Sequence, residues 1–151
     1  MKIEFTVAGE PQGKQRPRFA KRGQYISVRT PEKTKDYEEN IWAAFWEQCG
    51  NVTFPEGSQL ELRVLAFFKI PKSTSKRKQA AMLSGEIRPT KKPDIDNVLK
   101  AVADALNGVC YKDDSCIVKM SGEKFYSDNP RIVVIFKICT KKKKKIYFWY
   151  I

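Results

Sequence analysis

A group of acidic residues whose spacing could do chemistry lies between positions 94 and 114 of a basic chain. It contains Asp94 and Asp96, then Lys100 four residues after Asp96, and later the adjacent pair Asp113 and Asp114. Carboxylates alone would repel a phosphate backbone, whereas a hard divalent cation converts them into oxygen ligands. A water on such a cation can attack phosphorus, and a neighbouring lysine adds positive charge against the transition state. The pattern predicts metal-assisted cleavage of phosphodiesters, with Mg²⁺ or Mn²⁺ as the cofactor.

Each of these residues also has an ordinary structural interpretation. Asp94 can satisfy free backbone N–H groups at a helix start, Asp96 and Lys100 can form a surface pair, and Asp113 can be a turn residue. A calcium-binding EF-hand loop is excluded, because Val98 stands where a third oxygen ligand is needed and no glycine follows. The joint pattern, in a protein built for polyanions, favours the metal site.

The composition indicates a polyanionic partner. The chain has 151 residues, with 29 Lys and Arg against 17 Asp and Glu, and a formal net charge of +12. Nucleic acid is the first expectation and an anionic membrane the second. The chain has no histidine, which excludes Ser-His-Asp hydrolases, His-metal nucleases and Cys₂His₂ fingers.

The four cysteines contain no Cys-x-x-Cys pair, so a structural zinc site is not expected. Free thiols in a reducing compartment are the expected state. The N-terminal residues alternate like a strand rather than forming a signal peptide, and no 20-residue apolar span is present. We therefore expect a cytoplasmic protein that does not interact with membranes.

A helix and a turn must position the acidic residues. Residues 94–107 have helical periodicity, and Gly108 ends the pattern. Asp96, Lys100 and Asp104 share one flank of this helix. The opposite flank is an apolar stripe, formed by Ile95, Val98, Leu99, Val102 and Leu106. Residues 111–115 are expected to form a turn that leads into a strand.

The other elements indicate a single α+β domain. Five strands are predicted, at residues 3–7, 25–28, 60–68, 117–125 and 132–138. A long helix is predicted from Thr30 as N-cap, with Pro31 at its first position, to Gly50, and a short one near residues 79–83. The predicted architecture is a mixed sheet packed against two main helices, in the rough order ββαβ(α)αββ.

Two aromatic features have more than one interpretation. Trp42 and Trp46 extend the apolar face of the long helix, so we expect them in the core, with base stacking as the alternative. Residues 140–151 form a basic and aromatic tail outside the domain of residues 1–139. This tail could contact membrane or nucleic acid, form a further strand, serve as a docking segment, or have no function.

At the acidic cluster the sequence resembles the RusA family of Holliday junction resolvases. The resemblance is carried by Asp94-x-Asp96-Asn97-x-x-Lys100, followed by Asp104-x-Leu106 and then Asp113-Asp114. The segment Gly9-x-Pro11-x-x-Lys14-x-Arg16-Pro17-Arg18 and the pair Thr30-Pro31 also resemble members from phage and prophage. The similarity runs from about Ile3 to Ile138.

The resemblance implies a homodimeric, Mg²⁺-dependent endodeoxyribonuclease that cuts two opposed strands of a four-way DNA junction. By position, Asp94, Asp96 and Asp114 match the metal-binding carboxylates of the family, and Asp113 matches a less critical neighbour. Lys100 matches the catalytic lysine. A dimer with twofold symmetry would present two identical sites to a junction that has nearly the same symmetry.

Several basic residues are candidates for contacts with the DNA backbone, and together they predict steep salt dependence. They are Lys14, Arg16, Arg18, Lys69, Lys72, Lys76, Arg77, Lys78, Lys91 and Lys92. Three alternatives to a junction resolvase remain at this point. They are a nuclease for other branched or flapped DNA, a non-catalytic DNA-binding module, and an RNA-binding accessory protein. The last two predict unchanged function on Asp94→Asn, whereas both nucleases require the carboxylate.

Overall fold

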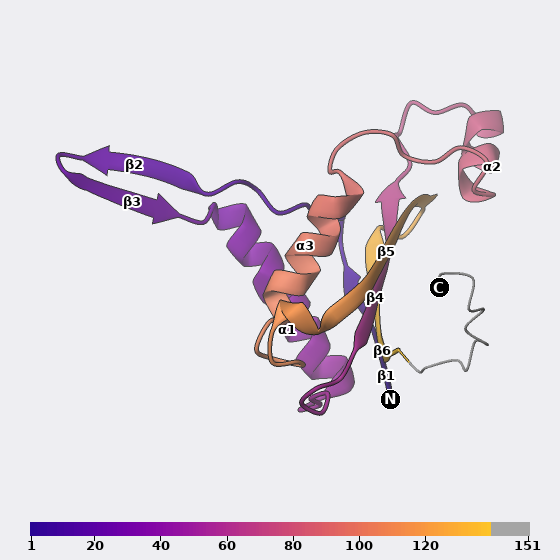
Figure 1. Ribbon diagram of the computed structural model, residues 1–151. Coiled ribbons are helices and arrows are strands. Elements are labelled where there is room, and N and C mark those ends of the chain that lie inside the picture. Colours follow the sequence, from indigo (N-terminus) through magenta and orange to yellow (C-terminus); the bar gives the residue numbers. More distant parts are fainter. Residues whose placement is uncertain (140–151) are drawn as a thin grey trace, which may run out of the picture.

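The computed structural model describes residues 1–139, which form an α+β domain with a projecting two-stranded arm (Figure 1). The elements, in chain order, are β1 (Lys2–Ala8), β2 (Arg18–Arg22), β3 (Tyr25–Arg29), α1 (Glu32–Cys49), β4 (Leu60–Lys69), α2 (Lys76–Leu83), α3 (Ile95–Leu106), a short 3₁₀ turn (Asp114–Cys116), β5 (Ile117–Ser127) and β6 (Arg131–Ile138). The main sheet has the order β1-β6-β4-β5. It is mixed, because β4 pairs in parallel with β5 whereas β6 is antiparallel to both β1 and β4. The predicted fold class is confirmed.

The core lies between this sheet and the pair of helices α1 and α3 (Figure 1). Alternate residues of β1, namely Ile3, Phe5 and Val7, are buried, as the period of two predicts. Helix α3 buries Val98 and Leu106 along its predicted apolar stripe. Its opposite flank, which carries Asp96 and Lys100, therefore remains accessible.

Helix α1 differs from the prediction in two respects. Its N-cap is Pro31 rather than Thr30, because the Pro31 carbonyl accepts the first hydrogen bonds, from the N–H groups of Thr34 and Lys35. The core prediction for Trp42 and Trp46 was wrong: their exposed fractions are 46% and 36%. The buried stripe of α1 is narrow, and each tryptophan follows one of its members by a single residue, about 100° around the helix.

One strand, β2, was not predicted. It pairs only with β3, and all residues of both strands are exposed. Burial therefore imposes no alternating pattern on β2, and its sequence Arg-Phe-Ala-Lys-Arg gave no strand signal. The hairpin of residues 18–29, hereafter the arm, extends away from the sheet and beyond the start of α1 (Figure 1).

The remaining expectations concern the short helix, the tail and the membrane. Helix α2 begins at Lys76, earlier than predicted, because the Ser75 side chain caps it by accepting a hydrogen bond from the Lys78 N–H. The tail of residues 140–151 lies outside the described residues. Within residues 1–139 no helix has the length and apolar character needed to cross a bilayer.

Gly122 sets how closely α3 approaches β5. A Cβ atom at this position would lie 2.6 Å from Ile95 Cγ1 and 3.1 Å from Leu99 Cδ1. We expect Gly122→Ala to push α3 away from the sheet and to lower the free energy of unfolding by about 1–3 kcal/mol. Urea denaturation measures the change. Ser121→Ala, on the neighbouring half-buried residue, is the control and should shift stability by less than about 0.5 kcal/mol. An unchanged midpoint for Gly122→Ala would contradict the tight packing.

Candidate active site

The first two acidic residues lie at the start of α3 and are both exposed. Asp94 occupies the predicted N-cap position, but its side chain makes no capping hydrogen bond. Asp96 follows in the first turn. Within residues 1–139, no hydrogen bond or ion pair engages either carboxylate. The purely structural role considered for Asp94 is thus not the one it performs here, and both carboxylates are available to a ligand.

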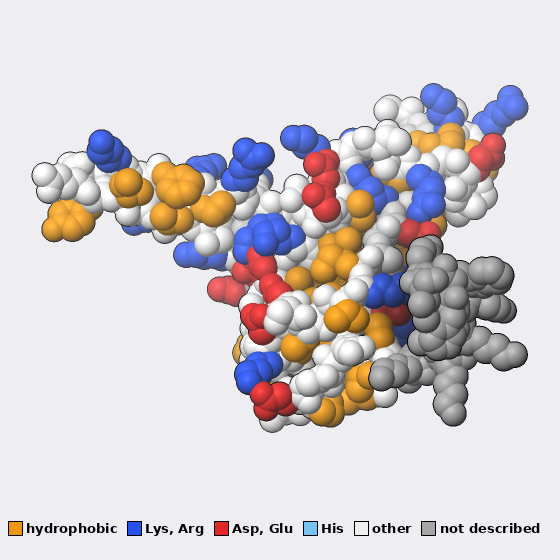
Figure 2. Space-filling view, viewed as in Figure 1, with side chains coloured by type: hydrophobic (Ala, Val, Ile, Leu, Met, Phe, Trp, Pro, Cys, Tyr) orange, Lys and Arg blue, Asp and Glu red, His pale blue; other side chains and the backbone are white. Residues whose placement is uncertain are grey.

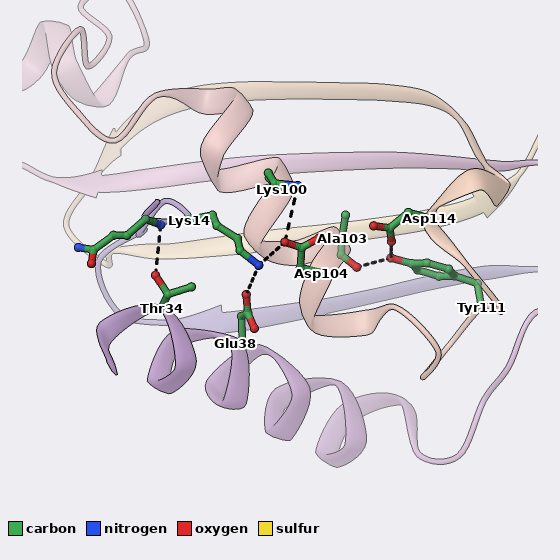
Figure 3. A network of polar contacts seen from close by, with 9 residues as sticks. Lys14, Thr34, Glu38, Lys100, Ala103, Asp104, Tyr111 and Asp114 are labelled. Atoms are coloured by element: carbon green, nitrogen blue, oxygen red, sulfur yellow. Dashed lines mark hydrogen bonds and ion pairs between the residues drawn. The ribbon is translucent and has the colours of Figure 1, made fainter. Parts of the chain in front are cut away.

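A second group of charged side chains lies beside the C-terminal half of α3 (Figure 3). Lys14, from the segment before the arm, contacts the Asp104 carboxylate and lies 3.1 Å from Glu38 Oε1 on α1. Lys100 Nζ lies 3.8 Å from the same Asp104 carboxylate. Burial alone would lower the pKa of Lys14, but the hydrogen bonds and charges of Asp104 and Glu38 outweigh it, and the pKa is raised. Lys14 is therefore a fixed cation of this network.

Asp114 joins the same region through Tyr111 (Figure 3). The Tyr111 hydroxyl donates to the Ala103 carbonyl at 2.6 Å and lies 3.2 Å from Asp114 Oδ1. A hydroxyl has one proton, so these two acceptors compete for it. Burial raises the pKa of the Asp114 carboxyl, and the nearby carboxylates of Asp104 and Asp113 raise it further. The hydrogen bond with Tyr111 and the charge of Lys100 lower this pKa, but the net shift is upward. The site holds more negative charge than its own residues neutralise.

The adjacent Asp113 is differently placed. Its exposed carboxylate accepts a hydrogen bond of 3.1 Å from the Ser115 N–H, and so caps the 3₁₀ turn. Hydrogen bonds from Ser115 hold the pKa of Asp113 below its ordinary value. Asp113 thus has a local structural task, whereas Asp114 faces the charged network.

The structure pairs Lys100 with Asp104 and places Asp114 within electrostatic range of both, whereas Asp94 and Asp96 lie at the other end of α3, at its start. Asp96 and Asp104 are eight residues apart, which is about 12 Å along a helix axis. Within residues 1–139, no three acidic or cysteine side chains lie close enough to enclose a metal ion. Mg²⁺ needs less than this, because it keeps several waters and binds one or two carboxylates. The donor atoms are all oxygens, which suits such an ion, and in this arrangement no more than two of the carboxylates reach any one ion.

The candidate DNA contacts form two basic regions. All of them except the half-buried Lys14 are exposed. Arg16 and Arg18 belong to the arm and the segment before it, and the others lie around α2 and the loops at that end of the sheet. Figure 2 shows Lys and Arg side chains in both regions, with acidic side chains between them above α3. The exposed acids at the start of α3 thus lie between two areas of basic surface.

Two members of the site were not predicted from the sequence. Glu38 follows Tyr37 on α1, and nothing in its sequence surroundings distinguishes it from other exposed acids of that helix. Tyr111 stands three residues before Asp114, and this spacing across a tight turn is the signal that could have linked the two. Lys14 was predicted as a DNA contact, and the structure shows that it pairs with two carboxylates.

Comparison with known proteins shows the family to which this chain belongs. The family described as "Endodeoxyribonuclease RusA" matches residues 8–137, which include every candidate residue of the site. The uncharacterized protein YqaN of Bacillus subtilis (strain 168) is 39% identical over 137 residues, covering 89% of this chain and 95% of that protein. The chain belongs to the RusA endodeoxyribonuclease family of Holliday junction enzymes, which hydrolyse phosphodiester bonds of DNA.

Proposed function

We propose that this chain is a Mg²⁺-dependent resolvase that cuts four-way DNA junctions by paired symmetric nicks. The observation that carries the proposal is the position of Asp114. It is half-buried, lies within electrostatic range of Asp104 and Lys100, and belongs to a segment that the family match covers. Uncompensated carboxylates beside a lysine are unfavourable for a stable core but suit a site that takes a cation and a phosphate.

The residues proposed to serve the metal are Asp94, Asp96 and Asp114, with Asp113 as a supporting neighbour. At most two of these carboxylates reach one ion in the described arrangement, and Mg²⁺ would complete its coordination with waters. Asp113 is already committed to capping the 3₁₀ turn, which favours Asp114 as the ligand of this pair. When bound, the ion supplies a water of lowered pKa and positive charge for the phosphate oxygens. Mn²⁺ has the same preference for oxygen ligands and should replace Mg²⁺.

The lysines of the site have separate proposed tasks. Lys100 is 62% exposed, so its ammonium group can reach a phosphate while Asp104 keeps it directed toward the site. It would stabilise the negative charge that develops on the phosphate oxygens. Lys14 is held between Asp104 and Glu38 and would fix the orientation of Asp104 rather than contact DNA.

Paired nicks require two sites, because one site of this kind cuts one strand. A homodimer with twofold symmetry would present two copies to opposed strands of the junction. The exposed basic residues near the arm and α2 would draw in the phosphates, which predicts an affinity that falls steeply with salt.

Cleavage of a synthetic mobile four-way junction tests the function, with a linear duplex of the same sequence as the control. We expect paired, symmetric nicks only in the junction and only with Mg²⁺ or Mn²⁺. Cutting of flaps or forks in preference to the four-way junction would point to another branched substrate. Binding without cutting in either metal would refute the enzymatic proposal.

A further inference from the structure

The arm has two chemically different faces. Residues paired across an antiparallel hairpin share a face, and successive residues alternate between the two faces. On one face Phe19 pairs with Val28, and Lys21 pairs with Ile26. The other face carries the remaining pairs, which are Arg18 with Arg29, Ala20 with Ser27, and Arg22 with Tyr25. The arm is therefore a ribbon with one mainly apolar face and one mainly basic face.

The apolar face has no cover within the described residues. Phe19, Ile26 and Val28 are 72%, 67% and 59% exposed. A two-stranded hairpin that is isolated from a larger sheet is only marginally stable in water. Apolar side chains gathered on such an element indicate a surface that binds another molecule.

The charge of the arm and its flanking segments indicates the kind of partner. Residues 11–31, which comprise the arm and the segments that join it to the domain, contain six basic residues and no acidic one. A run of this kind attracts a polyanion. The start of α1 has mixed character, with Glu32, Asp36 and Glu39 exposed beside Lys33 and Lys35. Phosphates are thus favoured along the arm more than along the neighbouring helix.

The base of the arm is attached to the candidate active site. The Lys14 N–H donates to the Asn97 carbonyl at 3.0 Å, and the Gln15 N–H donates to Thr34 Oγ1 at 3.2 Å. Gly13 lies so close to α3 that a Cβ atom there would be 2.9 Å from Asn97 Cβ. A DNA strand held at Asp94 and Asp96 would therefore lie next to the base of the arm.

We propose that the arm is a DNA-binding β-ribbon whose apolar face, centred on Phe19, contacts unstacked bases at the branch point. This inference rests on the proposed junction substrate. The basic face, with Arg18, Arg22 and Arg29, contacts the phosphates of the flanking duplex. Ribbons of two strands fit DNA grooves, and apolar side chains can insert between base steps. A branch point offers bases whose stacking is already interrupted, so the insertion costs less there than in a continuous duplex.

Binding measured in a chelator tests the inference independently of cleavage. Phe19→Ala should weaken binding to a four-way junction about tenfold, because it removes the aromatic ring on which a base stacks. Binding to a linear duplex should change less than about twofold. Phe19→Trp keeps an aromatic plane and should retain the junction affinity. The fluorescence of 2-aminopurine at the branch point should rise when the unaltered chain binds, because separation from the neighbouring bases relieves their quenching, and should rise less with Phe19→Ala.

Two further variants complete the design. Trp42→Ala removes another exposed aromatic side chain, from α1, and so tests the base-stacking alternative for that helix; the arm inference expects both affinities to stay unchanged. Arg22→Ala should weaken junction and duplex binding alike and lower the salt dependence by about one counterion.

Three outcomes would overturn the inference. One is equal loss of junction and duplex binding with Phe19→Ala, and another is no loss of either. The third is that Phe19→Ala sediments as a smaller species than the unaltered chain while its DNA affinity is retained. This result would mean that a second copy of the chain covers the apolar face. If the unaltered chain cuts junctions and Phe19→Ala binds and cuts them equally well, only the arm inference fails. If the unaltered chain neither binds nor cuts the junction, the proposed function fails with it.

Discussion

Asp96→Asn and Asp114→Asn are each expected to reduce junction cleavage to below about a thousandth of the unaltered rate while junction binding is retained or tightened. An amide keeps the shape of the side chain but loses the charge that a divalent cation requires. Removal of a negative charge next to the DNA backbone also lessens repulsion, which is why binding should not weaken. The measurement is single-turnover cleavage in Mg²⁺, combined with binding in a chelator.

Asp113→Asn provides a matched comparison for these two variants. Asn is as good a cap as Asp, so the hydrogen bond from the Ser115 N–H should survive and most of the cleavage should remain. Asp128→Asn, in the turn between β5 and β6, is the control for an exposed acid away from the site. Near-normal cleavage by Asp96→Asn or Asp114→Asn would contradict the metal-site assignment.

Lys100→Ala should lower the single-turnover cleavage rate by about 10²–10³-fold and change junction affinity by less than about threefold. The effect on the rate is that of losing one group that stabilises charge in the transition state. Affinity changes little because many other exposed Lys and Arg side chains share the contacts with the backbone.

Lys78→Ala is the matched control, since Lys78 is an exposed lysine on α2, outside the acidic network. It should weaken binding, with no effect on the rate once the enzyme is saturated with DNA. If Lys100→Ala instead lost rate and affinity by the same factor, Lys100 would be a phosphate anchor and not a catalytic group.

The regular parts of the fold were predictable because a buried face requires apolar residues at regular spacing along the sequence. The stripe of α3 and the alternation of β1 follow from the repeats of 3.6 and 2 that a buried face imposes. Strand β2 gains no burial, so no period marks it. Trp42 and Trp46 are apolar, but composition alone does not say which side of a helix faces the core.

The candidate site was predictable only where its residues are close in sequence. Asp94, Asp96, Lys100 and the later acidic pair stand out because they interrupt a basic chain within one helix and one turn. The connection of Asp104 to Lys14 spans ninety residues and joins two elements that pack only in the folded state. A pairing of this kind leaves no local pattern, because any exposed acid and base would look the same in the sequence.

Gly13 and Lys14 are anchored against the first turn of α3, so the arm projects from a fixed point beside the acidic residues. Each strand of the arm has five residues and spans about 17 Å, and its base cannot slide along the helix that carries Asp94 and Asp96. With the apolar face seated at the branch point, the distance from that point to the phosphate at the acids is constant. The cut would then follow the branch point as it migrates, at an offset set by the length of the arm.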